Sequence, residues 1–356
     1  MTSSHLDTIV GLADKVTALR KRPLIVIFYP LGSSMIEENV RQLYLLLRDV
    51  AKLSRSQPLP QVDVLVQTYG GDPLTGYHMS QLVFAYANEV EYLVPEHSYS
   101  AGTLMCCGAN KILLGDLGVL SPIDITLDYA PGDDSDKKEE ELFPDELGSE
   151  SVETVAINHF IRVARDARVE VEAEFRRRGW RNSKTEVEGA LLCEMTQQVG
   201  VMKIARYYRE RDITTEYARQ LLETRMFSAH ERRRIESILR YLVIDAPGHG
   251  FQLDLHLCKR IGLRVEGMDE ELAKATVELT TALTKAAKDG DEIFASGPRR
   301  SARLPFFHYE AYEPPAATAA EPELGDSAHE SPKDEPKPVD EEVTNGHANV
   351  AIAGRS

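Results

Sequence analysis

A glycine pair and a serine, each placed directly after a predicted strand, are the residues of this chain best suited to do chemistry. The pair is Gly70-Gly71, which falls between a strand-like run and a helix-like run. Glycine lets the backbone turn sharply and present an N–H group with no Cβ in the way. An N–H group held near a helix N-terminus can stabilise a negative charge that develops on oxygen.

Ser100 stands at a second turn of the same kind, in the segment 98–102, which reads Ser-Tyr-Ser-Ala-Gly. A serine on a tight strand-to-helix turn presents its hydroxyl at the helix N-terminus, and the N–H of the next residue, Ala101, faces the same space. The alternative is that Ser100 is an ordinary helix N-cap, because serine is a preferred capping residue. Gly70-Gly71, taken alone, is equally consistent with a simple turn.

Alternating strand-like and helix-like runs must position these two turns. The strand-like runs are 24–28, 62–66, 90–94 and 111–114. Apolar residues at helical spacing fill the gaps between them, so the pattern predicts right-handed βαβ units and a mostly parallel sheet. In such sheets ligands gather at the carboxyl ends of the strands, where both turns fall.

The order of these features resembles the Clp-protease/crotonase superfamily. Within it, the chain is most similar to the ClpP-class serine peptidases of the serine dehydrogenase proteinase family, which are related to signal peptide peptidase A. The residues that carry the resemblance are Gly70-Gly-Asp72, Ser100-Ala-Gly-Thr103, and the segments 108–112 and 120–124. A looser match joins 249–253 with 258–263.

The resemblance implies a ClpP/crotonase-like α/β core and a serine hydrolase that cleaves peptide bonds. Ser100 would attack the carbonyl carbon, and the N–H groups of Gly71 and Ala101 would hold the oxyanion. Members of the superfamily assemble into rings or stacked oligomers. We therefore expect a homo-oligomer that acts on a peptide or protein substrate.

Serine also needs a base, and the sequence offers two kinds. Where ClpP supplies a histidine, this chain reads Ser-Pro-Ile-Asp-Ile at 121–125, whereas relatives of signal peptide peptidase A use a lysine. His249 lies in a Gly-His-Gly loop, and a histidine base needs no large pKa shift because imidazole ordinarily titrates near neutral pH. Lys203, on a predicted amphipathic helix, is the most plausible lysine because a lysine base needs desolvation. Asp124 is a candidate for orienting the base. Weaker candidates are Lys137, Lys138, Lys184, His78, His97 and His159.

Two other functions are compatible with these residues. A chain that keeps the fold but lacks the base would be a catalytically inactive binding or scaffold protein. An acyl-CoA hydratase-like enzyme would need carboxylates beside the oxyanion hole, but no paired glutamates lie near Gly71 in the sequence. Nothing resembles a nicotinamide-binding GxGxxG segment or a pyridoxal lysine motif, so no cofactor is expected, and no metal site.

Composition narrows the class of protein. The 356 residues carry a formal charge of −16, which argues against a general nucleic-acid binder. No apolar run is long enough for a transmembrane helix and no signal-peptide pattern occurs, so we expect a cytoplasmic protein. The four cysteines, at positions 106, 107, 193 and 258, suggest buried free thiols in a reducing compartment.

The expected organisation has a helical C-terminal region and a disordered acidic tail after the core. Within the helical region, apolar spacing predicts separate helices at 186–211 and 215–224. The expected parts are an N-terminal helix (1–22), a catalytic core (23–130), an acidic mobile loop (131–150), a helical region completing the fold (151–293) and a largely disordered tail rich in proline and acidic residues (294–356).

Overall fold

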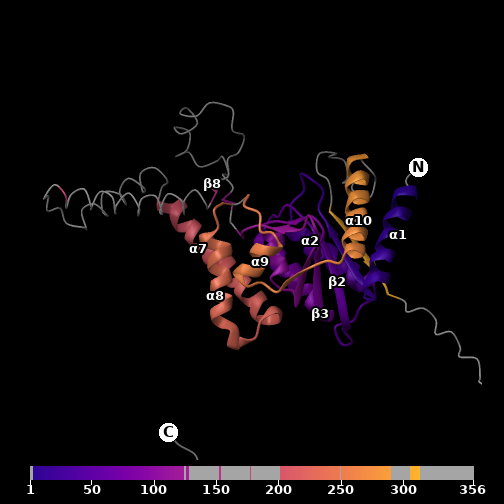
Figure 1. The fold of residues 1–356 in the computed structure, drawn as a ribbon, viewed down its shortest axis with the longest axis horizontal. Helices are drawn as coiled ribbons and strands as arrows, with labels where there is room; N and C mark the ends of the chain where they lie inside the picture. Colours follow the sequence, from indigo (N-terminus) through magenta and orange to yellow (C-terminus); the bar gives the residue numbers. More distant parts are fainter. Residues whose placement is uncertain are drawn as a thin grey trace, which may run out of the picture. The chain divides into compact units, whose positions relative to one another are not determined.

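A six-stranded, mostly parallel sheet forms the centre of the computed structural model (Figure 1). The strands are β1 (Leu24–Phe28), β2 (Leu59–Gln67), β3 (Ala87–Val94), β5 (Lys111–Leu114), β9 (Val265–Gly267) and β10 (Phe306–Glu310). Their order is β10-β1-β2-β3-β5-β9, and every neighbouring pair is parallel except β10 with β1. The expected mixed α/β fold with a mostly parallel sheet is therefore confirmed. Two small pairs flank it: β4 (His97–Ser98) with β6 (Val119–Leu120), and β7 (Thr126–Leu127) with β8 (Val152–Glu153).

The structure describes most of the chain up to residue 312. The described residues are 3–123, 126–127, 152–153, 177, 201–248, 250–289 and 305–312. All of them belong to one compact unit, Met1–Pro314. The predicted acidic loop at 131–150 and most of the predicted tail lie outside this set. Within it, no helix combines the length and the apolar character that crossing a bilayer requires.

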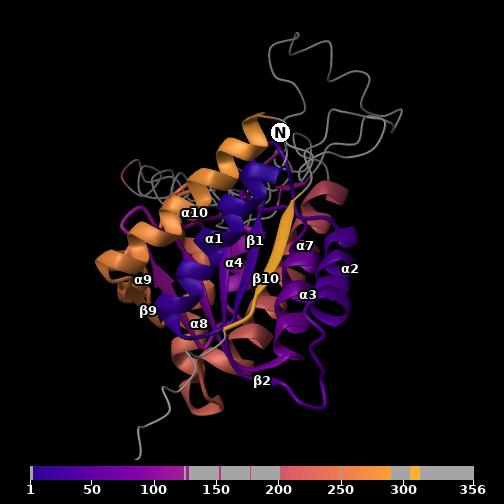
Figure 2. The same ribbon diagram turned by 90° about the vertical axis from the view of Figure 1, so that its right-hand side faces the viewer.

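Helices cover both faces of the sheet (Figures 1 and 2). They are α1 (Ser3–Arg20), α2 (Glu37–Leu45), α3 (Pro73–Phe84), α4 (Ala101–Cys106), α7 (Val201–Leu221), α8 (Arg232–Arg240), α9 (Leu255–Ile261) and α10 (Glu270–Asp289). π-Helical turns at Leu46–Val50, Leu222–Met226 and Tyr241–Asp245 extend α2, α7 and α8, and a 3₁₀ turn, Ala229–Glu231, precedes α8. Figure 2 shows α1 and α10 side by side on one face. Residues of α2, α3, α4, α7 and α8 pack on the other face.

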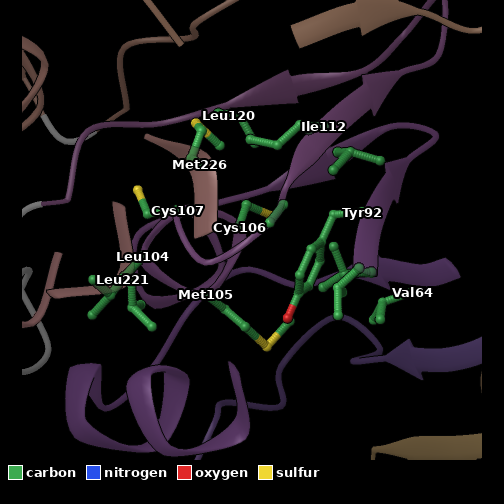
Figure 3. Packing of buried hydrophobic residues seen from close by; sticks show 14 of the residues in the cluster. Val64, Tyr92, Leu104, Met105, Cys106, Cys107, Ile112, Leu120, Leu221 and Met226 are labelled. Atoms are coloured by element: carbon green, nitrogen blue, oxygen red, sulfur yellow. The ribbon is translucent and has the colours of Figure 1, made fainter. Parts of the chain in front are cut away.

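The larger core lies between the sheet and the layer that contains α3 and α4. Side chains of alternate strand residues, such as Val64 and Tyr92, enter this core. In Figure 3 the Tyr92 ring extends from β3 toward Met105 of α4. Helices α3 and α4 approach closely because residue 76 is glycine, where a Cβ would lie 2.5 Å from the carbonyl oxygen of Ala101. This packing fixes the position of α4 and thereby of the turn that precedes it.

The opposite face of the sheet packs against α1 and α10. Leu65 and Leu93 lie among the apolar residues of these two helices. On the same strands, Asp63 and Glu91 carry side chains that are only 1% and 5% exposed. The Arg20 guanidinium at the end of α1 contacts both, with Nε 2.5 Å from Asp63 Oδ2 and Nη2 2.6 Å from Glu91 Oε2. These buried ion pairs tie α1 to β2 and β3.

Three of the cysteines are core residues, as the composition suggests. Cys106, Cys107 and Cys258 are free and buried, and Cys193 lies outside the described residues. Burial raises the pKa of the Cys106 and Cys258 thiols to about 12, so they stay protonated at neutral pH.

One expectation for the C-terminal half is wrong. Helix α7 runs without a break through 212–214, where the sequence predicts that two helices meet, because Tyr207, Thr214 and Ala218 are all buried along it. Strand β10 lies inside the segment 294–356, which composition predicts to be largely disordered, and pairs with β1 over five residues. Pairing with an open strand edge adds order that local composition does not reveal.

Candidate active site

Ser100 occupies the sharp turn between β4 and α4, and its backbone is strained. Its φ is 51° and its ψ is −112°. Among the described residues other than glycine, only Lys21 and Lys52 share a positive φ. The Ser100 side chain makes no capping hydrogen bond to α4, and the residue is 6% exposed. A conformation of this kind costs about 1–3 kcal/mol and persists only where the surroundings enforce it.

Buried hydroxyl groups enforce this turn. The Ser100 N–H donates to Ser121 Oγ at 2.7 Å, and Ser121 Oγ donates to the Pro122 carbonyl at 3.0 Å. The Ser121 N–H donates to Thr103 Oγ1 at 3.1 Å, and Thr103 Oγ1 donates to the Ser98 carbonyl at 2.7 Å. The chain before Ser100, the first turn of α4 and the segment after β6 are thereby joined around Ser100.

The glycine pair lies directly against Ser100. A Cβ added to Gly70 would stand 2.9 Å from Ser100 Cβ and 3.5 Å from Ser100 Oγ. Gly70 has a φ of +107° and Gly71 a φ of +141°, both unfavourable for any residue with a side chain. A Cβ on Gly71 would overlap the backbone of Met35. The two turns that the sequence singled out therefore meet in space.

The N–H groups of Gly71 and Ala101 form no hydrogen bond to any acceptor within the described residues. Gly71 lies opposite Met35 in a parallel bridge, in which the Met35 N–H donates to the Gly70 carbonyl at 2.9 Å and the Asp72 N–H donates to the Met35 carbonyl at 3.0 Å. Since polar groups of successive strand residues point to opposite sides, the Gly71 N–H is directed away from Met35. Two donors are thus available beside the Ser100 turn.

Asp72 explains why a helix begins immediately after the glycine pair. Its side chain accepts hydrogen bonds from the Thr75 N–H at 2.8 Å and from the Leu74 N–H at 3.4 Å. Pro73 follows at the first position of α3, where its lack of an N–H has no cost. This strong N-cap ends the extended chain at Gly71.

His249 and Asp124 both lie outside the described residues, but the residues shortly after His249 contact the chain next to Ser100 and Ser121. Leu253 exchanges two backbone hydrogen bonds with Leu120, at 3.0 and 2.9 Å. Gln252 Nε2 donates to the Tyr99 hydroxyl at 3.3 Å. Gln252 and Leu253 therefore lie against Tyr99, which precedes Ser100, and against Leu120, which precedes Ser121.

The other basic candidates are distributed along the chain. Lys203 lies in α7, where its side chain is outside what the structure describes, and His78 lies on α3. Lys137, Lys138, Lys184 and His159 also fall outside the described residues. In the described part of the chain, no three histidine, cysteine, aspartate or glutamate side chains form a group that could hold a metal ion.

An aromatic cluster beside the site was not anticipated from the sequence. The His97 ring stands 4.4 Å from the Tyr69 ring and 5.0 Å from the Tyr99 ring, between centroids. Burial lowers the pKa of His97 to about 4, and its Nε2 has no hydrogen-bond partner within the described residues. The His97 ring is therefore neutral at neutral pH. The sequence contains one sign of this cluster: Tyr69 directly precedes the glycine pair, and Tyr99 directly precedes Ser100.

Comparison with known proteins adds little to this geometry. No protein-family model matches the chain. An uncharacterised protein of Methanocaldococcus jannaschii is 29% identical over 86 residues, which is 24% of this chain and 29% of that protein. The chain thus spans less than a third of the length of this relative, whose description assigns no activity.

Proposed function

We propose that the protein is a serine peptidase with a Clp-protease/crotonase type of fold, in which Ser100 is the nucleophile. The observation that carries the proposal is the strained Ser100 turn packed against Gly70. Such strain is concentrated at functional sites, because it must be sustained by the rest of the fold. Two N–H donors beside the same turn give the arrangement of an oxyanion hole.

The mechanism follows from these groups. Ser100 Oγ attacks the carbonyl carbon of a peptide bond while a base takes its proton, and the carbonyl oxygen becomes an oxyanion. The N–H groups of Gly71 and Ala101 stabilise that oxyanion, each contributing about 3–4 kcal/mol in enzymes of this kind. The base then passes the proton to the leaving amine, and water hydrolyses the acyl-enzyme.

His249 is the base that we favour, and Lys203 is the alternative. The contacts of Gln252 and Leu253 bring the segment next to His249 against the Ser100 turn. A histidine base would make the reaction rate fall below about pH 6.5, whereas a lysine base would place the inflection higher unless strongly desolvated. We also propose that the protein forms a homo-oligomer and lies in the cytoplasm.

The deciding experiment is covalent labelling with a fluorophosphonate probe. We expect the full chain to be labelled, with the adduct mapped to Ser100 by mass spectrometry of its peptides. The Ser100→Ala variant should not react, whereas Ser56→Ala, at an exposed serine, should react like the parent chain. A folded parent chain that takes no label would overturn the proposal and favour a binding or scaffold protein.

A further inference from the structure

Thr68 connects the two turns of the candidate active site through its backbone. It directly follows β2 and is buried. Its N–H donates to the His97 carbonyl at 3.3 Å, and its carbonyl accepts a hydrogen bond from the Tyr99 N–H at 3.0 Å. The Thr68 backbone therefore holds the chain that leads to Gly70 beside the chain that leads to Ser100.

The two branches of the Thr68 side chain contact the neighbours of the two proposed oxyanion donors. Thr68 Oγ1 accepts a hydrogen bond from the N–H of Gly70, which directly precedes Gly71, at 3.0 Å. Thr68 Cγ2 lies against Gly102, which directly follows Ala101, so that a Cβ added to Gly102 would overlap it. Because a β-branched side chain has few rotamers, Thr68 holds both contacts in a fixed geometry.

The direction of the Gly71 N–H depends on the hydrogen bonds of the residue before it. The Gly71 N–H and the Gly70 carbonyl belong to one planar peptide group, in which they point in opposite directions. The Met35 N–H donates to the Gly70 carbonyl at 2.9 Å and fixes one side of Gly70. The Thr68 hydroxyl fixes the other side, at the Gly70 N–H. Since glycine permits backbone rotations that other residues resist, each of these bonds opposes a turn of the peptide group.

We propose that Thr68 is a positioning residue of the oxyanion hole: its hydroxyl holds the Gly70 N–H, so that the next N–H, that of Gly71, points at the developing oxyanion. This inference rests on the proposed peptidase function. Loss of the hydroxyl leaves both donors in the chain but frees the Gly71 N–H to turn away. The attack of Ser100 should then slow, whereas the protonation of the base should not change.

The test is the rate at which Ser100 reacts with the fluorophosphonate probe. Ser100 Oγ attacks phosphorus, the base takes the hydroxyl proton, fluoride leaves, and the phosphoryl oxygen carries the developing negative charge. Thr68→Val keeps the size and the branching of the side chain but removes the acceptor. We expect this variant to react about 10- to 100-fold more slowly, a smaller loss than the roughly 100- to 1,000-fold expected when an oxyanion donor is removed outright.

A second pair of variants separates the hydroxyl from the methyl group. Thr68→Ser and Thr68→Ala both lack Cγ2, and only the serine keeps an oxygen that accepts from the Gly70 N–H. Thr68→Ala should therefore react about 10- to 100-fold more slowly than Thr68→Ser. Urea denaturation establishes which variants are folded, and the Ser and Ala pair decides the question if Thr68→Val does not fold.

Thr17→Val is the matched control. Thr17 is also buried, and its hydroxyl also bonds to the backbone, at the Ala13 carbonyl 2.9 Å away. It lies on α1, which packs on the opposite face of the sheet from α4, so Thr17→Val should react at the parent rate. The pH dependence of labelling adds a readout that general damage to the fold would change. The pH of half-maximal rate should be the same in every variant, because none of them touches the base.

The outcomes separate this inference from the proposed function. Equal rates of the parent chain and Thr68→Val, or of Thr68→Ser and Thr68→Ala, would overturn the positioning role and leave the hydrolase proposal standing. A slower rate accompanied by a shifted pH dependence would do the same, because it would assign Thr68 a general structural role. A folded parent chain that takes no label would overturn the proposed function, and the positioning role with it.

Discussion

Replacing Gly70 with alanine should destabilise the protein and slow the reaction of Ser100 with fluorophosphonate. The φ of +107° disfavours any L side chain, at a cost of about 1–2 kcal/mol. The new Cβ would also lie 2.9 Å from Ser100 Cβ and 3.1 Å from the Tyr99 carbonyl oxygen. Forcing a group into a packed site costs a further 1–3 kcal/mol or so, which gives a total of roughly 2–5 kcal/mol.

Gly32 offers a matched control for the backbone contribution alone. Its φ is +87°, yet a Cβ there would meet nothing within 4 Å. Gly32→Ala should therefore lose only about 1–2 kcal/mol. The amount by which Gly70→Ala lowers the free energy of unfolding beyond Gly32→Ala then measures the steric crowding at Ser100.

Urea denaturation gives both free energies of unfolding, and a labelling time course gives the rate at Ser100. A displaced Ser100 should react at least about 100-fold more slowly, as expected when a reacting atom moves by about 1 Å. Gly32→Ala should label at the parent rate. If the two variants were equally stable and labelled equally fast, the close approach of Gly70 to Ser100 would be irrelevant to function and our reasoning would be refuted.

Three further predictions concern the groups around the site and the buried charges. Burial lowers the pKa of His97 to about 4, whereas the histidine of the unfolded chain takes up a proton near pH 6.5. The free energy of unfolding should therefore fall as the pH drops from about 6.5 toward 4. The expected loss is about 1–3 kcal/mol, after allowance for the partial exposure of the ring. Ser121→Ala removes the acceptor of the Ser100 N–H, so it should cost about 1–3 kcal/mol and slow labelling by the fluorophosphonate. Arg20→Met removes the guanidinium that pairs with the buried Asp63 carboxylate, so the free energy of unfolding in urea should fall by about 2–4 kcal/mol.

Each of these predictions has a control within the chain. His97→Phe keeps a ring between Tyr69 and Tyr99 and should make the free energy of unfolding less dependent on pH. If that pH dependence were unchanged, it would arise from groups other than His97. Ser56→Ala should leave stability and labelling as they are. Arg48→Met breaks an exposed ion pair with Asp49 and should change nothing measurable, so an equal loss at Arg20 and Arg48 would contradict the role of burial.

Four strands, β1, β2, β3 and β5, and the two turns could be predicted because their signals are local. Each of these strands is rich in apolar residues, and Leu24–Phe28 is buried at every position. The glycine pair and Ser100 mark sharp turns by residue type alone. The break expected within α7 is wrong because Asp212 lies on the exposed side of the helix and Thr214 on its buried side, so one buried face continues through the segment.

Features that depend on contacts between residues far apart in the sequence could not be predicted. Gln67 looks like an ordinary strand residue, and the sequence does not show that its Oε1 is buried with no hydrogen-bond partner among the described residues, or that α10, more than 200 residues later, lies beside it. Likewise, the sequence does not show that His97 packs between Tyr69 and Tyr99, where burial lowers its pKa to about 4. His249 and Asp124 stay predictions, since the structure does not describe them.

Strand β10 has a consequence for how separate molecules of this protein meet. It occupies the outer edge of β1, a strand of five buried apolar residues whose free backbone groups would otherwise accept a strand from another molecule. At the opposite edge of the described sheet, β9 is only three residues long and a poor template for such growth. A chain shortened to end before residue 305 would expose β1, so fibril-like aggregation at that edge is the expected hazard of trimming the tail.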